Sequence, residues 1–390
     1  MPLNDRIQIR SYDSLDALEG IRPEWEGLSQ GYAHSTTFST WEWLAPWWRA
    51  FGAQDRLLAL AGYSHDRLIG FAPLSLSRQR GFGADLNFVR LMGDGTPDSD
   101  NLDIPVRQGY DAVFSRSLVS WLETHSQAWD VCQLRTLPSA SSVGHCIVDL
   151  LQSRGWSPYI SKRPQSVIEL PETWEQYGKM LSAKERGKIG LRFRKLEKKY
   201  KLEIRKCAEE SELERSLNAL FDLHGKHWQQ RGLPGTFDIK ERRQFYQELS
   251  SLLLKKGLLE FWVLKLNDQV VAAQFGFRYD KTVFSLQEGF DPAFSADSVG
   301  YVLRSQVLKS IIERGIRAYD FLGGTNESKM RWGATLKNYI DIEFARPSSM
   351  GSAYLRLKTK TAETKEWFRM RLPSPVLRTW KRIAQGTSVD

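Results

Sequence analysis

The chain has 390 residues, of which 41% are hydrophobic and 26% charged, as in a soluble globular protein with room for two domains. A net charge of +9 fits nucleic acid, an anionic membrane surface or a phosphate-rich small molecule, and does not choose among them. The lack of a signal segment, of a membrane-length apolar run and of paired cysteine spacing predicts a cytoplasmic protein in a reducing compartment, with any membrane contact peripheral.

The first half contains a predicted unit of strands followed by a helix and another strand. Apolar runs predict a hairpin from residues 56–63 and 67–78. A polar stretch rich in aspartate, MGDGTPDSDNLD (92–103), precedes a helix expected over 110–126 and a strand over 129–137. Because acidic residues repel a phosphate, we expect this stretch to shape an acceptor groove rather than to bind a phosphate.

A basic helix is predicted over LSAKERGKIGLRFRKLEKKY (181–200). Its lysines and arginines would bind tRNA or anionic lipid, or would form a solvated helix face. The sequence leaves these alternatives open, and nothing in it indicates a DNA partner.

His224, His227 and Trp228 follow at helical spacing, and Arg231-Gly232 then interrupts the helix. Two histidines three residues apart can share a helix face, as metal ligands do, but a third ligand with recognisable spacing is missing, so we expect no metal. One of the histidines is a candidate catalytic or substrate-binding group, and the alternative is a histidine that only packs at a helix end.

The second half repeats the order of the first. Strands are predicted over 259–266, 270–279 and 282–290, then a helix over 298–315 and a strand over 318–322. The order strand, strand, strand, helix, strand therefore occurs twice, which predicts an α+β protein made of two copies of one unit. We place the units at 1–165 and 166–346, with a basic, partly amphipathic tail at 347–390.

Two stretches after these strands are candidate sites. The loop before the helix at 298 has small residues, which let an anion approach the free N–H groups of a helix start; an ordinary N-cap by Asp297 or Ser298 is the alternative. The stretch YDFLGGTNESKMRWG (319–333) ends a strand with two glycines and then gathers Glu327, Lys329 and Arg331. These side chains suit a general base and oxyanion or phosphate ligands, or form a solvated turn anchored by Trp332.

Four stretches of the second half resemble the GNAT-type acyltransferases, in particular the cellulose-biosynthesis CelD/BcsL subgroup: HWQQRGLPGTF, VVAAQFGFRY, LQEGFDPAFSADSVGYVL and RGIRAYDFLGGTNESKMRWG. In the first half, TTFSTWEWLAPWWRAFG (36–52) resembles the N-terminal part of that subgroup. The subgroup is similar to the Fem-type aminoacyltransferases, which are built from two GNAT units. The resemblance thus implies two tandem GNAT-like units, each a mostly antiparallel central sheet flanked by helices.

The resemblance also implies transfer of an acyl group from a thioester donor, usually acyl-CoA, to an amine. The expected base is Glu327 or a histidine of the 224/227 pair, with Glu288 as a further candidate. The expected substrate ligands are Trp228, Arg231, Lys329, Arg331 and Trp332. The expected pyrophosphate ligands are Ser295, Ala296, Asp297, Ser298, Val299 and Gly300. Because this loop has a single glycine, acyl-carrier protein and aminoacyl-tRNA stay open as donors.

The leading function predicted in this way is N-acylation of an amine in envelope, exopolysaccharide or lipid synthesis. The alternatives are long-chain acylation of an amino-lipid such as a sphingoid base, Fem-like aminoacyl transfer from tRNA, and a non-catalytic binding subunit. A helical tail with Trp367, Phe368 and Leu372 on one face would favour the lipid variant.

Overall fold

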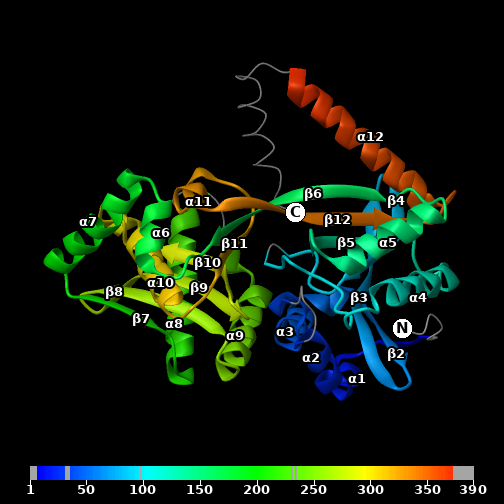
Figure 1. Ribbon diagram of the computed structural model, residues 1–390, viewed down its shortest axis with the longest axis horizontal. Coiled ribbons are helices and arrows are strands. Elements are labelled where there is room, and N and C mark those ends of the chain that lie inside the picture. Colours follow the sequence, from blue (N-terminus) through cyan, green and yellow to red (C-terminus); the bar gives the residue numbers. More distant parts are fainter. Residues whose placement is uncertain (1–6, 31–35, 97, 230–231, 233–234, 372–390) are drawn as a thin grey trace.

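The computed structural model describes residues 7–30, 36–96, 98–229, 232 and 235–371. Twelve strands of these residues form one continuous sheet in the order β1-β2-β3-β4-β5-β12-β6-β11-β10-β9-β8-β7 (Figure 1). The strands are β1 (Gln8–Tyr12), β2 (Arg56–Ser64), β3 (Arg67–Gly81), β4 (Ala84–Leu91), β5 (Val131–Pro138), β6 (Tyr159–Glu169), β7 (Leu202–Lys206), β8 (Leu259–Leu266), β9 (Gln269–Tyr279), β10 (Thr282–Phe290), β11 (Ala318–Gly323) and β12 (Thr335–Phe344).

Helices flank the sheet in both halves (Figure 1). They are α1 (Leu15–Gly20), α2 (Arg22–Gln30), α3 (Trp41–Phe51), α4 (Asp111–Thr124), α5 (Ser142–Ser153), α6 (Trp174–Met180), α7 (Ala183–Lys199), α8 (Glu210–Gln229), α9 (Lys240–Lys255), α10 (Val299–Glu313), α11 (Glu327–Arg331) and α12 (Met350–Arg371). Short 3₁₀ turns add η1 (Thr37–Ser39), η2 (Gly52–Gln54), η3 (Thr236–Asp238) and η4 (Pro292–Asp297). Within the described residues, none of the helices is both long and apolar enough to span a bilayer.

The hairpins of the second half follow from local sequence. Apolar and aromatic runs form β8, β9 and β10, and the turns between them use Asn267, Asp268 and Asp280. These three residues have φ values of 49°, 67° and 47°, a left-handed conformation that asparagine and aspartate tolerate in tight hairpin turns.

The predicted internal repeat is confirmed. The first half has β2, β3, β4, α4 and β5, and the second half has β8, β9, β10, α10 and β11 in the same order. In each half the helix connects two parallel strands, β4 with β5 and β10 with β11, whereas the other neighbouring strands are antiparallel. The predicted α+β class, with a mostly antiparallel sheet flanked by helices, is therefore confirmed.

The two halves exchange their last strands. β6 follows β5 in the chain but pairs with β11 of the second half, and β12 follows β11 but pairs with β5 of the first half. β6 and β12 pair with each other at the centre of the sheet, where Figure 1 shows them crossing between the halves. The predicted unit boundary between residues 165 and 166 falls inside β6.

Aromatic residues of α3 and of the turn before it join the halves into one core. Phe38 packs edge-on against Phe277 and Phe284 of the second half, with ring centroids 5.3 and 5.8 Å apart. Trp43 packs on Phe245 of α9 at 5.2 Å. Phe38 and Trp43 belong to the aromatic 36–52 stretch, so this stretch contributes to the contact between the halves.

Candidate active site

A cleft opens where β10 and β11 diverge. The two strands pair in parallel only from Thr282 and Ala318 to Phe284 and Asp320. Beyond these pairs a cavity of about 360 Å³ lies between the strand ends. Its lining combines both halves of the chain: Asp100, Ser285, Leu286, Glu288, Arg304, Phe321, Leu322, Gly323, Asn326, Ser328 and Lys329.

A β-bulge shapes the β10 side of the cleft. The register places Ser285 opposite Gly276 and Gln287 opposite Phe275, so Leu286 is the extra residue of the bulge. A bulge takes the extra residue out of the hydrogen-bond ladder and bends the strand locally. The backbone of Leu286 therefore lies at the cleft wall, where the hydrogen-bond ladder between β9 and β10 is interrupted.

An ion pair crosses one side of the cleft. Arg304 on α10 donates from Nε to Glu288 Oε1 at 3.1 Å and also binds the second carboxylate oxygen. The guanidinium lies over the rings of Phe321 and Trp332, at 5.2 and 5.7 Å from their centroids. The candidate base Glu288 thus lines the cleft, and α10 supplies a fixed cationic partner for it.

Lys329 closes the turn at the end of β11. Its ammonium donates to the backbone carbonyls of Phe321, Gly323 and Gly324 at 3.0, 2.7 and 3.3 Å. Burial lowers the pKa of this lysine. Asn326 caps α11 by accepting from the Lys329 N–H at 2.9 Å. Lys329 lines the cleft, and its hydrogen bonds to three backbone carbonyls stabilise the end of β11 where it diverges from β10.

Two aspartates lie near the end of β11: Asp100 lines the cleft, and Asp320 is buried in the strand. Asp100, from the first-half loop, accepts from the Gly323 N–H at 2.9 Å, and burial raises the pKa of its carboxyl. Asp320 on β11 is 3% exposed and accepts from the Leu322 N–H at 2.8 Å. Burial raises the pKa of Asp320 to about 7, and the nearby charge of Asp100 adds to the rise. Asp100 lines the cleft, and a carboxyl with a raised pKa in a cleft is a candidate for proton transfer.

The predicted base Glu327 lies outside this cleft. Its side chain is 90% exposed and pairs with Arg331 at 3.2 Å. Both residues line a separate, open surface groove, which shares Asn326 with the cleft. Trp332 is the buried anchor of this turn, since it is 2% exposed and its carbonyl accepts from the Tyr177 hydroxyl at 2.8 Å.

His224 packs beneath the end of β10. It is 6% exposed, its Nε2 accepts from Trp228 Nε1 at 2.9 Å, and its ring meets Phe237 at 5.0 Å. A methyl group at Gly289 would come within 2.9 Å of the backbone nitrogen of His224, so α8 and β10 are in close contact. The His227 side chain and Arg231 lie outside the described residues.

The predicted pyrophosphate loop forms η4 and the start of α10. Ser298 occupies the N-cap position of α10, as in one of the two capping alternatives, but it is left-handed (φ 57°) and its side chain makes no capping bond in the described structure. Asp297 is 8% exposed and accepts from Lys199 Nζ at 3.1 Å and the Tyr200 hydroxyl at 2.9 Å. Val299 is buried, and Ser295 and Ala296 are exposed. The loop thus brings a carboxylate to the helix start, next to the end of α7.

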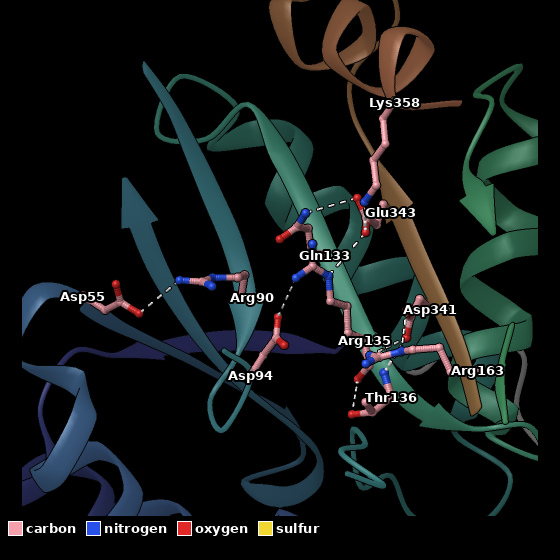
Figure 2. Close-up of polar contacts among 10 residues, drawn as sticks. All are labelled: Asp55, Arg90, Asp94, Gln133, Arg135, Thr136, Arg163, Asp341, Glu343 and Lys358. Carbon is pink, nitrogen blue, oxygen red and sulfur yellow. Dashed lines mark hydrogen bonds and ion pairs between the residues drawn. The ribbon is translucent and has the colours of Figure 1, made fainter. Parts of the chain in front are cut away.

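The first half diverges at the matching place, and ion pairs occupy the gap (Figure 2). β4 and β5 pair in parallel until Arg90 and Gln133. Beyond this point Arg135 lies 3.9 Å from Asp94 and 3.3 Å from Glu343 of β12. Oppositely charged side chains therefore neutralise one another where the second half has its cleft.

Two residues that line the cleft, Asp100 and Arg304, and the buried Asp320 on β11 were not predicted from the sequence, although Asp320 and Arg304 carried a signal. Asp320 is an acid inside the apolar strand AYDFL, and Arg304 is a base between buried positions of an apolar helix. A charged residue at such a position is seldom buried without a partner or a function. Asp100 was among the loop aspartates, but its placement depends on the contact between the halves. Within the described residues, groups of three or more potential metal ligands are not found.

Residues 183–330 match the sequence model of a GNAT acetyltransferase domain. The fold is similar to a crystal structure of FemX, with a TM-score of 0.62 at 10% identity over 83% of this chain and 96% of that chain. It is also similar to the C-terminal domain of a putative lysylphosphatidylglycerol synthetase from Agrobacterium fabrum (TM-score 0.52, 11% identity, 88% and 96% covered). L-PGS from Bacillus licheniformis gives a TM-score of 0.50 at 11% identity, with 85% and 94% covered.

Curated protein sequences give no match to the chain. At identities of 10–11%, the structural likeness establishes the fold alone. The sequence match lies within the second half, and the matched residues include α7, the β8–β11 strands and α10. The CelD/BcsL subgroup remains a prediction from sequence.

Proposed function

We propose that the protein is an N-acyltransferase that acts in the cleft between β10 and β11. The observation that carries the proposal is that a carboxyl of the first half and the bulged backbone of the second half meet in one cleft. Asp100 stands at one wall and Leu286 at the other. Amine acylation needs a base for the amine and a hydrogen-bond donor for the acyl oxygen, and these groups supply both.

In the proposed reaction, the amine enters as a cation and gives a proton to Asp100, whose burial raises its pKa and strengthens it as a base. The neutral nitrogen then attacks the acyl carbonyl carbon, a C–N bond forms, and the oxygen becomes an oxyanion. The Leu286 N–H is the proposed donor to that oxyanion. When the intermediate collapses, the bond to the donor's sulfur breaks and the departing thiolate takes the second proton from nitrogen.

The proposed donor is an acyl thioester, either acyl-CoA or an acylated carrier protein. Aminoacyl-tRNA is the second candidate, because Asp297 brings negative charge to the start of α10, where a pyrophosphate was expected. The adjacent helix α7 offers a cationic surface that could bind the phosphates of a tRNA. Its exposed basic residues are Lys184, Arg186, Arg194, Lys195, Lys198 and Lys199, the last of which pairs with Asp297.

The proposed acceptor is an amine-bearing small molecule of envelope or exopolysaccharide synthesis. Because Glu288 is paired with Arg304, Asp100 is the cleft carboxylate proposed to attract the cationic amine. An amino-lipid acylated at a membrane surface is the variant supported by α12, which leaves the body of the molecule (Figure 1) and carries Trp367 at 46% exposure. The Phe368 side chain and Leu372 lie outside the described residues.

The donor is tested by thermal unfolding with free CoA, acetyl-CoA, a long-chain acyl-CoA and an aminoacyl-tRNA. A ligand that binds only the folded state raises the melting temperature by an amount set by its concentration over its Kd. A shift with acetyl-CoA supports a small acyl group, and a shift with the long chain alone supports lipid acylation. A shift with the aminoacyl-tRNA alone would contradict the proposed thioester donor and indicate an ester donor instead.

The proposed base is tested by Asp100→Asn in an assay of amide product with the donor identified above. We expect kcat/KM to fall by roughly 10²- to 10⁴-fold, because a positioned base contributes about this much. Glu327→Gln is the matched control, and we expect less than about a twofold change because its side chain is 90% exposed outside the cleft. The reverse pattern, with the loss in Glu327→Gln, would place the base on α11.

A further inference from the structure

Tryptophan side chains of α3 fix the loop between β4 and α4 to the first half. Trp47 Nε1 donates to Thr96 Oγ1 at 3.0 Å, and Trp43 Nε1 donates to Ser99 Oγ at 3.1 Å. These anchors lie on both sides of Asp98 in the chain. The loop therefore presents Asp98 to the second half from a fixed position.

Asp98 is held by the second half of the molecule. Its side chain is fully buried, and Oδ1 accepts hydrogen bonds from the Tyr246 hydroxyl at 2.8 Å and from Gln287 Nε2 at 3.0 Å. Arg242 on α9 forms an ion pair with the same oxygen. A buried carboxylate is tolerated only with such charge-assisted partners, so α9 and β10 hold the loop firmly.

Both walls of the cleft lie next to these contacts in the chain. Asp100 follows Asp98 by two residues and binds the Gly323 N–H. Gln287, which binds Asp98, directly follows Leu286 in the bulge of β10. The Asp98 carboxylate therefore connects the side of the cleft that carries the proposed base with the side that carries the proposed oxyanion donor.

We infer that Asp98 is a positioning residue for amine acylation, which sets the separation between the Asp100 carboxyl and the Leu286 backbone amide. The inference rests on the proposed function, since it assigns Asp98 a role through those two groups. Reacting groups that are displaced by about 1 Å lose rate by roughly 100-fold. A single anchor that joins two halves of a chain at the cleft is placed to control that displacement.

The position of Asp100 also affects its proton affinity. Burial raises the pKa of Asp100, while the Gly323 N–H lowers it. The charged or titratable side chains around it come from several elements: Arg163 on β6, Glu288 on β10, Arg304 on α10, Asp320 on β11, Lys329 on α11, and Tyr339 and Asp341 on β12. If the loop loosens, water reaches the carboxyl and its pKa falls toward the ordinary value.

The test is Tyr246→Phe, which removes one hydrogen bond to Asp98 and keeps the ion pair with Arg242. We expect kcat/KM for the amine to fall by about 10- to 100-fold and the acid limb of its pH profile to move to lower pH. Tyr63→Phe is the matched control: it removes a buried hydroxyl bonded to Tyr12 at 3.1 Å between β1 and β2, and neither quantity should change. Gln287→Met serves as the second variant if Tyr246→Phe fails to fold.

A double variant separates positioning from a general loss of structure. In an Asp100→Asn background, Tyr246→Phe should lower kcat/KM by less than about twofold, because the separation that Asp98 sets matters only while the Asp100 base is present. The same loss in both backgrounds, together with an unmoved pH profile in the single variant, would overturn the inference.

A readout without turnover distinguishes this inference from the proposed function. If Asp100→Asn alone leaves the rate unchanged, the proposed base is wrong, and a carbon NMR titration of the Asp100 carboxyl decides the positioning role. A lower pKa of Asp100 in Tyr246→Phe than in the parent protein supports that role. An unchanged pKa overturns it.

Discussion

The buried carboxyl of Asp320 should make the protein less stable as the pH rises from 5 to 8. Burial raises the pKa of Asp320 from its ordinary 3.8 to about 7, so the folded state keeps this proton over a range in which the unfolded chain has lost it. Stability contributed by the bound proton is present at low pH and falls as the pH rises between the two pKa values.

The size of the effect follows from the width of that range. Each pH unit with one extra proton on the folded state changes the free energy of unfolding by about 1.4 kcal/mol. From pH 5 to a pKa of about 7 is two units, so the parent protein should lose about 3 kcal/mol between pH 5 and pH 8 from this group. Asp320→Asn carries no such proton, and Gln165 can turn its amide to meet the new side chain.

The assay is urea unfolding followed by tryptophan fluorescence at pH 5, 6, 7 and 8. The quantity of interest is the difference in unfolding free energy between the parent and Asp320→Asn, since other groups cancel in it. This difference should change by about 3 kcal/mol in favour of the variant over the series. Asp149→Asn, at an exposed position of α5, should show no such trend. Parallel pH dependence of the parent and Asp320→Asn would refute the reasoning.

Two further predictions concern the strands that frame the cleft, and a third concerns α8. Lys329→Met should lower the free energy of unfolding by about 1–3 kcal/mol in urea, because three backbone carbonyls lose their donor, whereas Lys337→Met on the surface should change it by less than about 0.5 kcal/mol. Gly276→Ala should cost more than about 2 kcal/mol, because the new methyl group would overlap the Phe284 carbonyl oxygen and part β9 from β10. Gly225→Ala in α8 should raise the melting temperature slightly, since within the described chain a methyl group there meets nothing within 4 Å and alanine favours a helix by about 1 kcal/mol. A melting temperature of Gly276→Ala equal to that of the parent would contradict the close approach of β9 and β10.

The local elements could be predicted because their signals are local. The strand 259–266 is β8 and the strand 282–290 is β10, with the predicted bounds, since alternating apolar runs and turn residues define both. The helix expected over 298–315 is α10, Val299–Glu313. The repeat emerged from these elements because each copy keeps the same order.

The pairing of β6 and β12 could not be predicted from such signals. Nothing in a strand's own sequence specifies a partner in the other half of the chain, and this exchange determines how the two units are joined. The placement of Asp100 depends on the same long-range contacts. A loop aspartate that repels phosphate and one that faces a cleft have the same sequence signal, and only the neighbouring half distinguishes them.

The candidate site was predicted in part. Glu288 and Lys329 line the cleft, and the glycines Gly323 and Gly324 mark the end of β11 there. Glu327 looked equally suitable in sequence, but α11 turns it outward, because a helix of one turn presents neighbouring residues to different sides. Which side faces the cleft is decided by Trp332, whose buried ring orients the turn.

The strand exchange has a consequence for synthesis on the ribosome. β5 is complete after Pro138, but its partner β12 pairs Pro138 with Tyr339, about 200 residues later in the chain. At roughly 5–20 residues per second, the β5 edge waits about 10–40 s for that partner. An apolar edge that stays open for so long can recruit the edge of another nascent chain. Slowly translated or crowded transcripts of this protein would therefore gain most from a chaperone that covers β5 until β12 emerges.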